Sequence, residues 1–275
     1  MKIENLINQI KQKKSFLCVG LDVDLDKIPK HLHKHEDPIF EFSKAIIDST
    51  SPFVIAYKPN LAFFESYGLK GWNSLEKIIN YINSNHPEIF TIADAKRGDI
   101  GNTSSKYART FFETLNFDSI TVNPYMGRDS IEPFLDYDNK YTILLSLTSN
   151  SGSSDFQFQL DNGKPLYLSV IKKSLSWKNK ENLMYVIGAT KAESLKEVRE
   201  IIPNSFLLVP GIGAQGGSLS DVCRFGLNEN CGLIVNSSRQ IIYSDNSIDY
   251  AKKSAEISSL IQREMSEQLL KKGII

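Results

Sequence analysis

The segment TIADAKRGDIGNT (91–103) places two acids and a lysine directly behind an apolar run. Asp94 and Lys96 are two residues apart, so on an extended strand their side chains would share one face while Ala95 points to the other. A carboxylate and an ammonium held in a partly desolvated site can stabilise a developing charge and transfer a proton. A purely structural ion pair is the alternative, and it would need further partners to offset its desolvation.

The segment VPGIGAQGG (209–217) provides a second chemical signal. Glycines after a strand let backbone N–H groups approach an anion, and the N-terminus of a following helix would add its positive dipole end. Arg239, in the later segment NSSR, could donate two hydrogen bonds to a phosphate. A tight Gly-rich turn is the alternative interpretation. We predict a phosphate loop that includes Gly211, Gly213, Gly216 and Gly217.

Apolar, β-branched runs recur along the chain, and each ends at polar or Gly/Pro residues. Because these runs are continuously apolar rather than alternating, we expect strands that are buried on both faces. They cover residues 15–23, 53–60, 88–96, 119–125, 141–149, 183–190, 206–213 and 232–239. Segments with helical periodicity lie between them, at residues 37–50, 73–85, 103–115, 163–177, 191–202 and 247–272.

The number of strand–helix units favours one architecture. Eight units in about 250 residues match an α/β fold of the (β/α)8 TIM barrel type. We predict one barrel domain over residues 1–275, with an N-terminal helix and a long C-terminal helix. Catalytic side chains of such barrels lie at the carboxyl ends of the strands, and the loop at 149–163 is long enough to form a lid there. The polar residues at the predicted strand ends include Asp22, Lys58, Asp94, Lys96, Asn123 and Ser149.

Composition excludes several classes of function. Lys+Arg and Asp+Glu both number 32, so no bulk charge favours nucleic acid or an anionic membrane as a partner. No stretch approaches the roughly 20 apolar residues of a membrane span. Three widely spaced cysteines without a CxxC motif argue against a disulfide framework or a zinc site and suit the cytoplasm. His31, His33 and His35 are interpreted as a solvated tract rather than metal ligands.

At this point the sequence resembles the orotidine 5′-phosphate decarboxylase family, in its longer bacterial subgroup. DAKRGDIGNT matches the family signature D-x-K-x-x-D-I-x-x-T, and AYKPNLAFFE, TVNPYMGRDSIEPF and VPGIGAQGG resemble other family segments. The resemblance covers nearly the whole chain. It implies a (β/α)8 homodimer with shared active sites and no metal or organic cofactor. The implied reaction is decarboxylation of orotidine 5′-monophosphate to UMP and CO2, the last step of de novo UMP biosynthesis.

The resemblance also implies roles for individual residues. Lys96 would protonate C6 of the pyrimidine, Asp94 would face the substrate carboxylate, and Lys58 would be the first lysine of the charged array. Asp99 would complete this array, and Asp99 and Thr103 would reach across the dimer interface. The remaining candidates for substrate binding are Asp22 at the ribose, Ser149 at the pyrimidine, Pro210 and Gln215 at the pyrimidine and phosphate, Arg239 at the phosphate, and Asn123.

The sequence departs from the family pattern in two places. Ser238 stands where a Gly usually precedes the phosphate arginine, and Asn150-Ser151 replaces a His-Pro or Asn-Pro pair before the lid glycine. Two alternative functions remain open at this point. Mg²⁺-dependent phosphosugar enzymes, the hexulose-phosphate synthases and keto-gulonate-phosphate decarboxylases, share the D-x-K-x-x-D motif. A non-catalytic barrel that binds phosphorylated metabolites is the other alternative.

Overall fold

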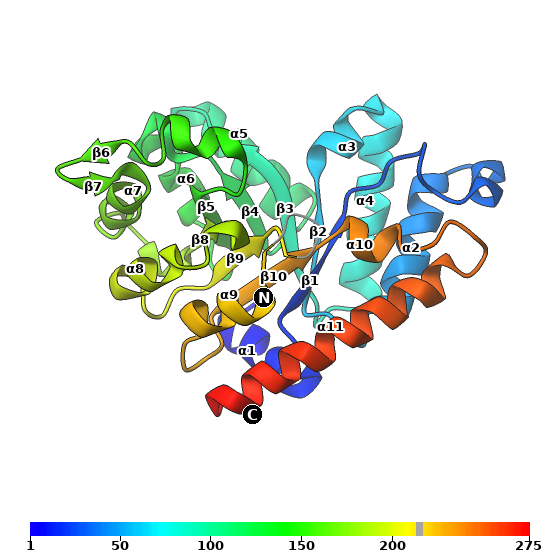
Figure 1. Ribbon diagram of the computed structural model, residues 1–275. Helices are drawn as coiled ribbons and strands as arrows, with labels where there is room; N and C mark the ends of the chain where they lie inside the picture. The colour runs from blue at the N-terminus through cyan, green and yellow to red at the C-terminus, as the bar shows by residue number, and fades with distance from the viewer. Residues whose placement is uncertain (213–216) are drawn as a thin grey trace.

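A closed barrel of parallel strands is the centre of the computed structural model, which describes residues 1–212 and 217–275 (Figure 1). Within these residues the strand order around the barrel is β1-β10-β9-β8-β5-β4-β3-β2. Each predicted strand overlaps one barrel strand, so the predicted (β/α)8 fold is confirmed. The barrel strands are β1 (Leu17–Leu21), β2 (Ala56–Pro59), β3 (Phe90–Arg97), β4 (Ser119–Val122), β5 (Tyr141–Leu147), β8 (Leu183–Ile187), β9 (Leu207–Pro210) and β10 (Leu233–Ser237).

The strands are mainly apolar because helices cover their outer face and side chains fill the interior. Every residue of β1, β2, β4, β8 and β10 is buried. Two hydroxyls within this core have partners on the surrounding helices. The Tyr57 hydroxyl donates to the carbonyl of Ile47 at 2.9 Å, and the Tyr185 and Ser174 hydroxyls lie 2.8 Å apart. These bonds tie barrel strands to the helices outside them.

Helices alternate with the strands as the periodicity predicts. The predicted helices correspond to α1 (Ile3–Lys13), α2 (Pro38–Thr50), α4 (Gly68–Asn85), α5 (Gly101–Arg109), α7 (Leu166–Ser174), α8 (Ser194–Ile201) and α11 (Tyr250–Lys272). Shorter helices were not predicted. Those of four or five residues are too short to show periodicity, whereas the segment 219–226 buries Leu219, Val222 and Cys223 at helical spacing and so had a signal in the sequence. These shorter helices are α3 (Leu61–Glu65), α6 (Glu132–Leu135), α9 (Leu219–Gly226) and α10 (Arg239–Ile242). Among the helices of the described residues, none is long and apolar enough to cross a membrane.

The segment at 149–163, expected to be a loop, contains ordered structure. A 3-10 turn at Ser151–Asp155 is followed by an antiparallel hairpin of β6 (Leu160–Asp161) and β7 (Lys164–Pro165). Asn162 and Gly163 between the two strands have φ values of 50° and 75°. Asn-Gly is the usual sequence for such a two-residue turn, so this hairpin had a signal in the sequence.

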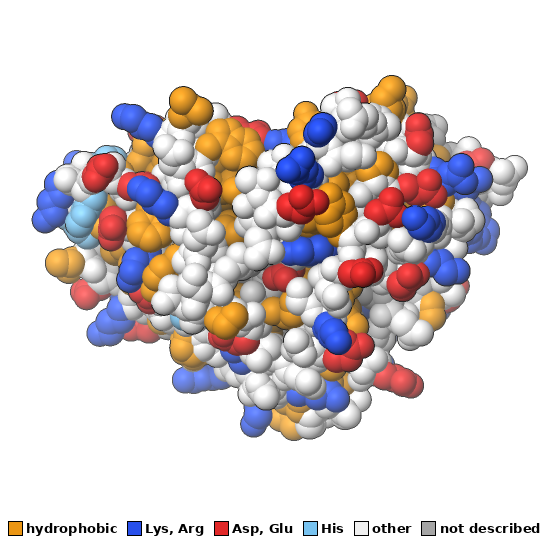
Figure 2. All heavy atoms as spheres, turned by 180° about the vertical axis from the view of Figure 1, so that it is seen from behind, with side chains coloured by type: hydrophobic (Ala, Val, Ile, Leu, Met, Phe, Trp, Pro, Cys, Tyr) orange, Lys and Arg blue, Asp and Glu red, His pale blue; other side chains and the backbone are white. Residues whose placement is uncertain are grey.

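The two ends of the barrel differ in what covers them. At the amino end, α1 buries Leu6 and Ile10, and the terminal ammonium of Met1 lies 2.5 Å from Asp118 Oδ1, just before β4. Figure 1 shows α1 and α11 at this end, while α3 and α5 lie at the other end. The space-filling view shows a notch in the same upper edge and mixes acidic and basic side chains over the visible face (Figure 2).

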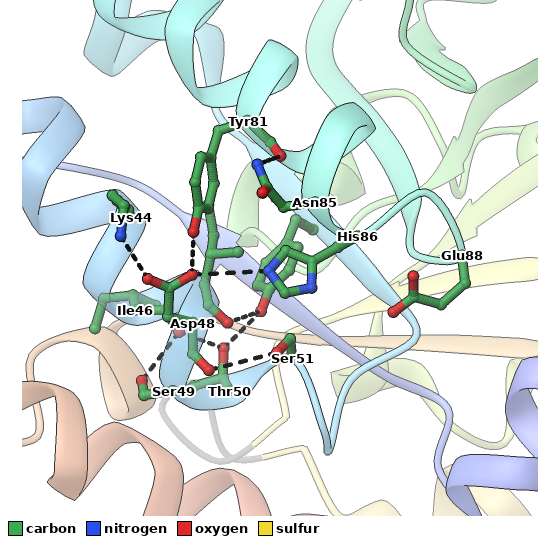
Figure 3. Close-up of polar contacts among 12 residues, drawn as sticks. Lys44, Ile46, Asp48, Ser49, Thr50, Ser51, Tyr81, Asn85, His86 and Glu88 are labelled. Atoms are coloured by element: carbon green, nitrogen blue, oxygen red, sulfur yellow. Dashed lines mark hydrogen bonds and ion pairs between the residues drawn. The ribbon is translucent and has the colours of Figure 1, made fainter.

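A polar network on the surface joins α2 to the end of α4 (Figure 3). The Asp48 carboxylate accepts from Lys44 Nζ at 2.7 Å and from the Tyr81 hydroxyl at 2.5 Å. His86, which follows α4, places Nε2 3.7 Å from the same carboxylate. This network lies where the chain turns toward the amino end of β2, and contacts at that end of such barrels serve stability rather than catalysis.

Candidate active site

A carboxylate lies between two ammonium groups where β2 and β3 reach the open end of the barrel. Lys58 Nζ is 2.6 Å from Asp94 Oδ2, and Lys96 Nζ is 2.5 Å from Asp94 Oδ1. Thr121 on β4 adds a hydroxyl 3.2 Å from Asp94 Oδ1. The structure therefore brings together the three charged residues that the sequence placed at adjacent strand ends.

The backbone that presents Lys96 is not a regular strand. Ala93 pairs with Ile120 and Arg97 pairs with Val122, so β3 carries two more residues than β4 across this interval. Lys96 takes a left-handed conformation with φ 49°, and its N–H donates to Thr121 Oγ1 at 2.9 Å. The expected contact between Asp94 and Lys96 is present, but a bulge produces it rather than simple alternation along the strand.

Arg97 fixes the far side of this bulge. Its guanidinium donates to the carbonyl of Ala95 at 3.0 Å and forms an ion pair with Glu65 at the end of α3. The guanidinium also lies over the rings of Tyr107 and Phe111, at 5.5 and 5.7 Å from the ring centroids. The unusual backbone at Lys96 is thus held between Thr121 on one side and Arg97 on the other.

Burial differs sharply within the charged trio. The side chains of Lys58 and Asp94 are 5% and 10% exposed, whereas that of Lys96 is 51% exposed. Burial alone would raise the pKa of Asp94, but the charges of Lys58 and Lys96 outweigh it and hold the pKa well below its ordinary value. Burial alone would lower the pKa of Lys58, but Asp94 and Asp22 raise it above its ordinary value. Lys96 is therefore the most exposed member of the trio.

Asp22 follows β1 and lies beside this trio. Its Oδ2 accepts a hydrogen bond from Ser238 Oγ at 2.8 Å, while its buried Oδ1 has no partner within the part of the chain that the structure describes. The charge of Asp22 contributes to the raised pKa of Lys58, so the two side chains interact electrostatically. A buried acceptor without a partner costs free energy, so a hydroxyl that donated to Oδ1 would be favoured.

Asp99 and Thr103, the two residues predicted to reach across a dimer interface, show no hydrogen bond or ion pair with the trio among the described residues. Asp99 is half-buried beyond β3, and its Oδ1 accepts from the N–H of Ile100 at 2.8 Å. Thr103 lies exposed in the first turn of α5. Neither appears in the ion pairs and hydrogen bonds that join Lys58, Asp94 and Lys96.

The predicted phosphate loop is partly described. Pro210 ends β9, Gly211 has φ 97°, and Gly217 donates from its N–H to the carbonyl of Gly211 at 3.1 Å. A Cβ on Gly217 would lie 2.6 Å from Ala189 Cβ, so only glycine fits there. Helix α9 follows, as the anion-site prediction requires, and exposed Arg239 begins α10. The predicted residues Gly213, Gln215 and Gly216 lie outside the described residues.

The remaining candidates follow β4 and β5, at the carboxyl ends of these strands. Asn123 follows β4, is exposed, and accepts from the N–H of Tyr125 at 3.1 Å through its side chain. Ser149 follows β5 and is half-buried. Among residues 1–212 and 217–275, no group of three or more His, Cys, Asp or Glu side chains is arranged to hold a metal ion.

Sequence reasoning missed two polar residues of the site. Thr121 contacts both Asp94 and the backbone of Lys96, and Asn236 on β10 accepts from the Cys18 thiol at 3.5 Å beneath the charged trio. Both lie in barrel strands, and their neighbours belong to other strands. The signal that could have found them is a polar residue at an inward position of an otherwise apolar strand.

Comparisons with known proteins agree with this geometry. The model of the orotidine 5′-phosphate decarboxylase / HUMPS family matches residues 15–254. An orotidine 5′-phosphate decarboxylase of Flavobacterium johnsoniae is 64% identical over 97% of this chain and 98% of its own length. One of Phocaeicola vulgatus is 59% identical over 97% and 98%, respectively. The solved structure of Leishmania donovani OMP decarboxylase gives a TM-score of 0.80 at 36% identity, covering 96% of this chain and 100% of that one. The chain belongs to the orotidine 5′-phosphate decarboxylase / HUMPS family.

Proposed function

We propose that this chain decarboxylates orotidine 5′-monophosphate to UMP and CO2, the last step of de novo UMP biosynthesis, with Lys96 as the proton donor. The observation that carries the proposal is the placement of Asp94 between Lys58 and Lys96 at the open end of the barrel. The family includes other phosphate-binding barrels, but the relatives that are 55–64% identical carry the decarboxylase name.

The chemistry requires a stabilised carbanion. When the C6–carboxylate bond breaks, CO2 leaves and the bonding electron pair stays on C6, in the plane of the ring. Lys96 Nζ would stabilise this charge and donate its proton to C6, giving UMP, and solvent would then reprotonate the amine. The half-exposed side chain of Lys96 supports this role, because the proton must reach a bound ligand.

Lys58 and Asp94 would prepare the site for that step. Asp94 keeps its charge because its pKa is lowered by the two lysines, and it would lie against the carboxylate that leaves. Repulsion between the two carboxylates would be relieved as CO2 departs. Lys58, whose own pKa is raised, holds Asp94 in place from the buried side.

The rest of the substrate would be held by the surrounding loops. Asp22 would accept from the ribose, while Arg239 and the glycine loop around Gly211 and Gly217 would bind the phosphate. Binding energy from the phosphate, far from C6, can be used to fix the geometry of the reacting ring. The residues proposed to contact the pyrimidine are Asn123, Ser149, Pro210 and Gln215.

A homodimer with shared active sites is also part of the proposal. Ile100, Tyr125 and Met126 border the opening and are 58%, 86% and 46% exposed, which leaves apolar surface next to Asp99 and Thr103. A second copy placed on this surface would cover it and bring Asp99 toward the partner's charged trio. A cytoplasmic location is supported by three buried cysteines without disulfides.

The loss of orotidylate absorbance with purified protein tests the reaction itself. We expect turnover that is unchanged after treatment with EDTA. Turnover that disappears with EDTA and returns with Mg²⁺ would favour the phosphosugar enzymes of the family. Binding of UMP without any turnover would favour a non-catalytic barrel.

A further inference from the structure

Ser238 joins the first and last strands of the barrel at the proposed substrate site. It follows β10, directly before Arg239, and its Oγ lies 2.8 Å from Asp22 Oδ2 and 3.0 Å from the carbonyl of Gly20. A hydroxyl has one proton to donate. A charged carboxylate is the stronger acceptor of the two, so we expect the proton to be shared mainly with Asp22.

Gly20 provides the space that Ser238 occupies. A Cβ at position 20 would lie 2.7 Å from Ser238 Cβ and 2.9 Å from Ser238 Oγ. These distances are shorter than real Cβ contacts, so a side chain at position 20 would push Ser238 away from Asp22. The glycine on β1 and the serine after β10 therefore fit each other.

The backbone and the side chain of Asp22 are held by different groups. The Tyr243 hydroxyl donates to the carbonyl of Asp22 at 2.8 Å and accepts from the N–H of Asp24 at 2.7 Å. These bonds fix the main chain. The carboxylate has a single hydrogen bond, from Ser238 to Oδ2, within the described residues. Removal of that hydroxyl would take away this hydrogen bond and leave the carboxylate oriented only by longer-range charges such as Lys58.

We propose that Ser238 is a positioning residue that orients the Asp22 carboxylate toward a ribose hydroxyl of the bound nucleoside monophosphate. This inference rests on the proposed role of Asp22 in the same site. Because Ser238 precedes the proposed phosphate ligand Arg239, one segment would serve the sugar and the phosphate together. Ser238 would thus contribute to the preference of the enzyme for ribonucleotides over deoxyribonucleotides.

Binding of UMP, 2′-deoxyUMP and 3′-deoxyUMP, measured by calorimetry, tests this role. One of the two deoxy analogues lacks the ribose hydroxyl that Asp22 binds. The wild type should bind UMP more tightly than this analogue. In Ser238→Ala and Ser238→Gly, UMP binding should weaken by at least about 10-fold, which corresponds to the lower end of the value of one hydrogen bond to a charged group. The affinity of the Ser238 variants for that analogue should stay close to the wild-type value. The ratio of the Kd for the analogue to the Kd for UMP should therefore be smaller in the variants than in the wild type.

Ser237→Ala is the matched control. Ser237 is adjacent, 4% exposed, and its Oγ has no hydrogen-bond partner among the described residues, so discrimination should stay at the wild-type level. Equal weakening of all three ligands by both Ser238 variants, or no weakening, would overturn the inference. Asp22→Asn distinguishes failure of the proposed ribose contact of Asp22 from failure of the proposed positioning role of Ser238. If it also leaves discrimination unchanged, the ribose role of Asp22 fails; if it abolishes discrimination while the Ser238 variants do not, only the role of Ser238 fails.

Discussion

Replacement of Asp94 by Asn would leave the Lys58 ammonium buried without a charged hydrogen-bond partner. The two groups are 2.6 Å apart and their side chains are 5% and 10% exposed, so solvent cannot replace the lost carboxylate. Removal of one partner from a buried ion pair costs roughly 3–5 kcal/mol. Asp22 still favours the charged form of Lys58 in the variant, so we expect the lower end, about 3 kcal/mol at neutral pH.

The pH dependence gives this prediction a second readout. In the wild type the pKa of Lys58 is raised above its ordinary value of 10.5. Lys58 therefore contributes to stability below pH 10.5, and this contribution is lost as the pH rises through the higher pKa of the folded state. The Asp94 pKa is lowered, so its contribution is present above 3.8 and is lost as pH falls through the folded-state value. Neither contribution should change between about pH 6 and 9. In Asp94→Asn, burial without this carboxylate should lower the pKa of Lys58 in the folded state. The unfolded state should then bind more protons than the folded state, so the free energy of unfolding should rise with pH.

Urea denaturation at fixed protein concentration, followed by circular dichroism from pH 6 to 9, provides the measurement. Lys96→Ala is the matched control because it removes the other ion pair of Asp94. Its ammonium is half-exposed and screened by solvent, so we expect a loss below about 1 kcal/mol and no pH slope. An Asp94→Asn variant as stable as the wild type at every pH would refute the view that Lys58 depends on this carboxylate.

Three further predictions concern the substrate, the dimer and the thiols. Arg239→Ala should raise KM for orotidine 5′-monophosphate more than it lowers kcat, and an unchanged KM would argue against a phosphate role. Mixed Lys96→Ala and Asp99→Asn subunits should recover activity, because one of the two sites in the mixed dimer is then intact; persistent inactivity would argue against shared sites. Ellman's reagent should not modify the native protein, since the thiols are buried and burial raises their pKa to about 12; rapid modification would contradict this for Cys18, Cys223 and Cys231.

The barrel strands could be predicted because both of their faces are buried, which makes each one a continuous apolar run. The family named from the sequence is also confirmed by the comparisons. Short helices such as α3 and α10 escaped prediction because four or five residues show too little periodicity, whereas the helical spacing of Leu219, Val222 and Cys223 in α9 was overlooked. The hairpin at Asn162 and Gly163 could have been predicted from its Asn-Gly turn sequence, but residues 149–163 were predicted to form one loop.

Several contacts in the site join different strands and could not be predicted from the sequence of one strand. Strict alternation led to the correct contact between Asp94 and Lys96, but a bulge and the hydroxyl of Thr121 produce it. The position of Ser238 above Gly20 depends on the pairing of β1 with β10, which are far apart in the sequence. Such contacts follow from closure of the barrel, so one strand considered alone does not contain them. The placement of Asp99 in the charged array remains a prediction, because it shows no hydrogen bond or ion pair with the trio among the described residues.

The turnover of Lys96→Ala tests the central claim most directly. General acid catalysis and electrostatic stabilisation by one group are together worth at least about a thousandfold in rate. We therefore expect kcat for decarboxylation of orotidine 5′-monophosphate to fall by at least about three orders of magnitude. Unfolding by urea should remain close to that of the wild type, because the side chain is half-exposed. A folded Lys96→Ala enzyme whose kcat stays within about tenfold of the wild type would contradict the assignment of Lys96 as the proton donor.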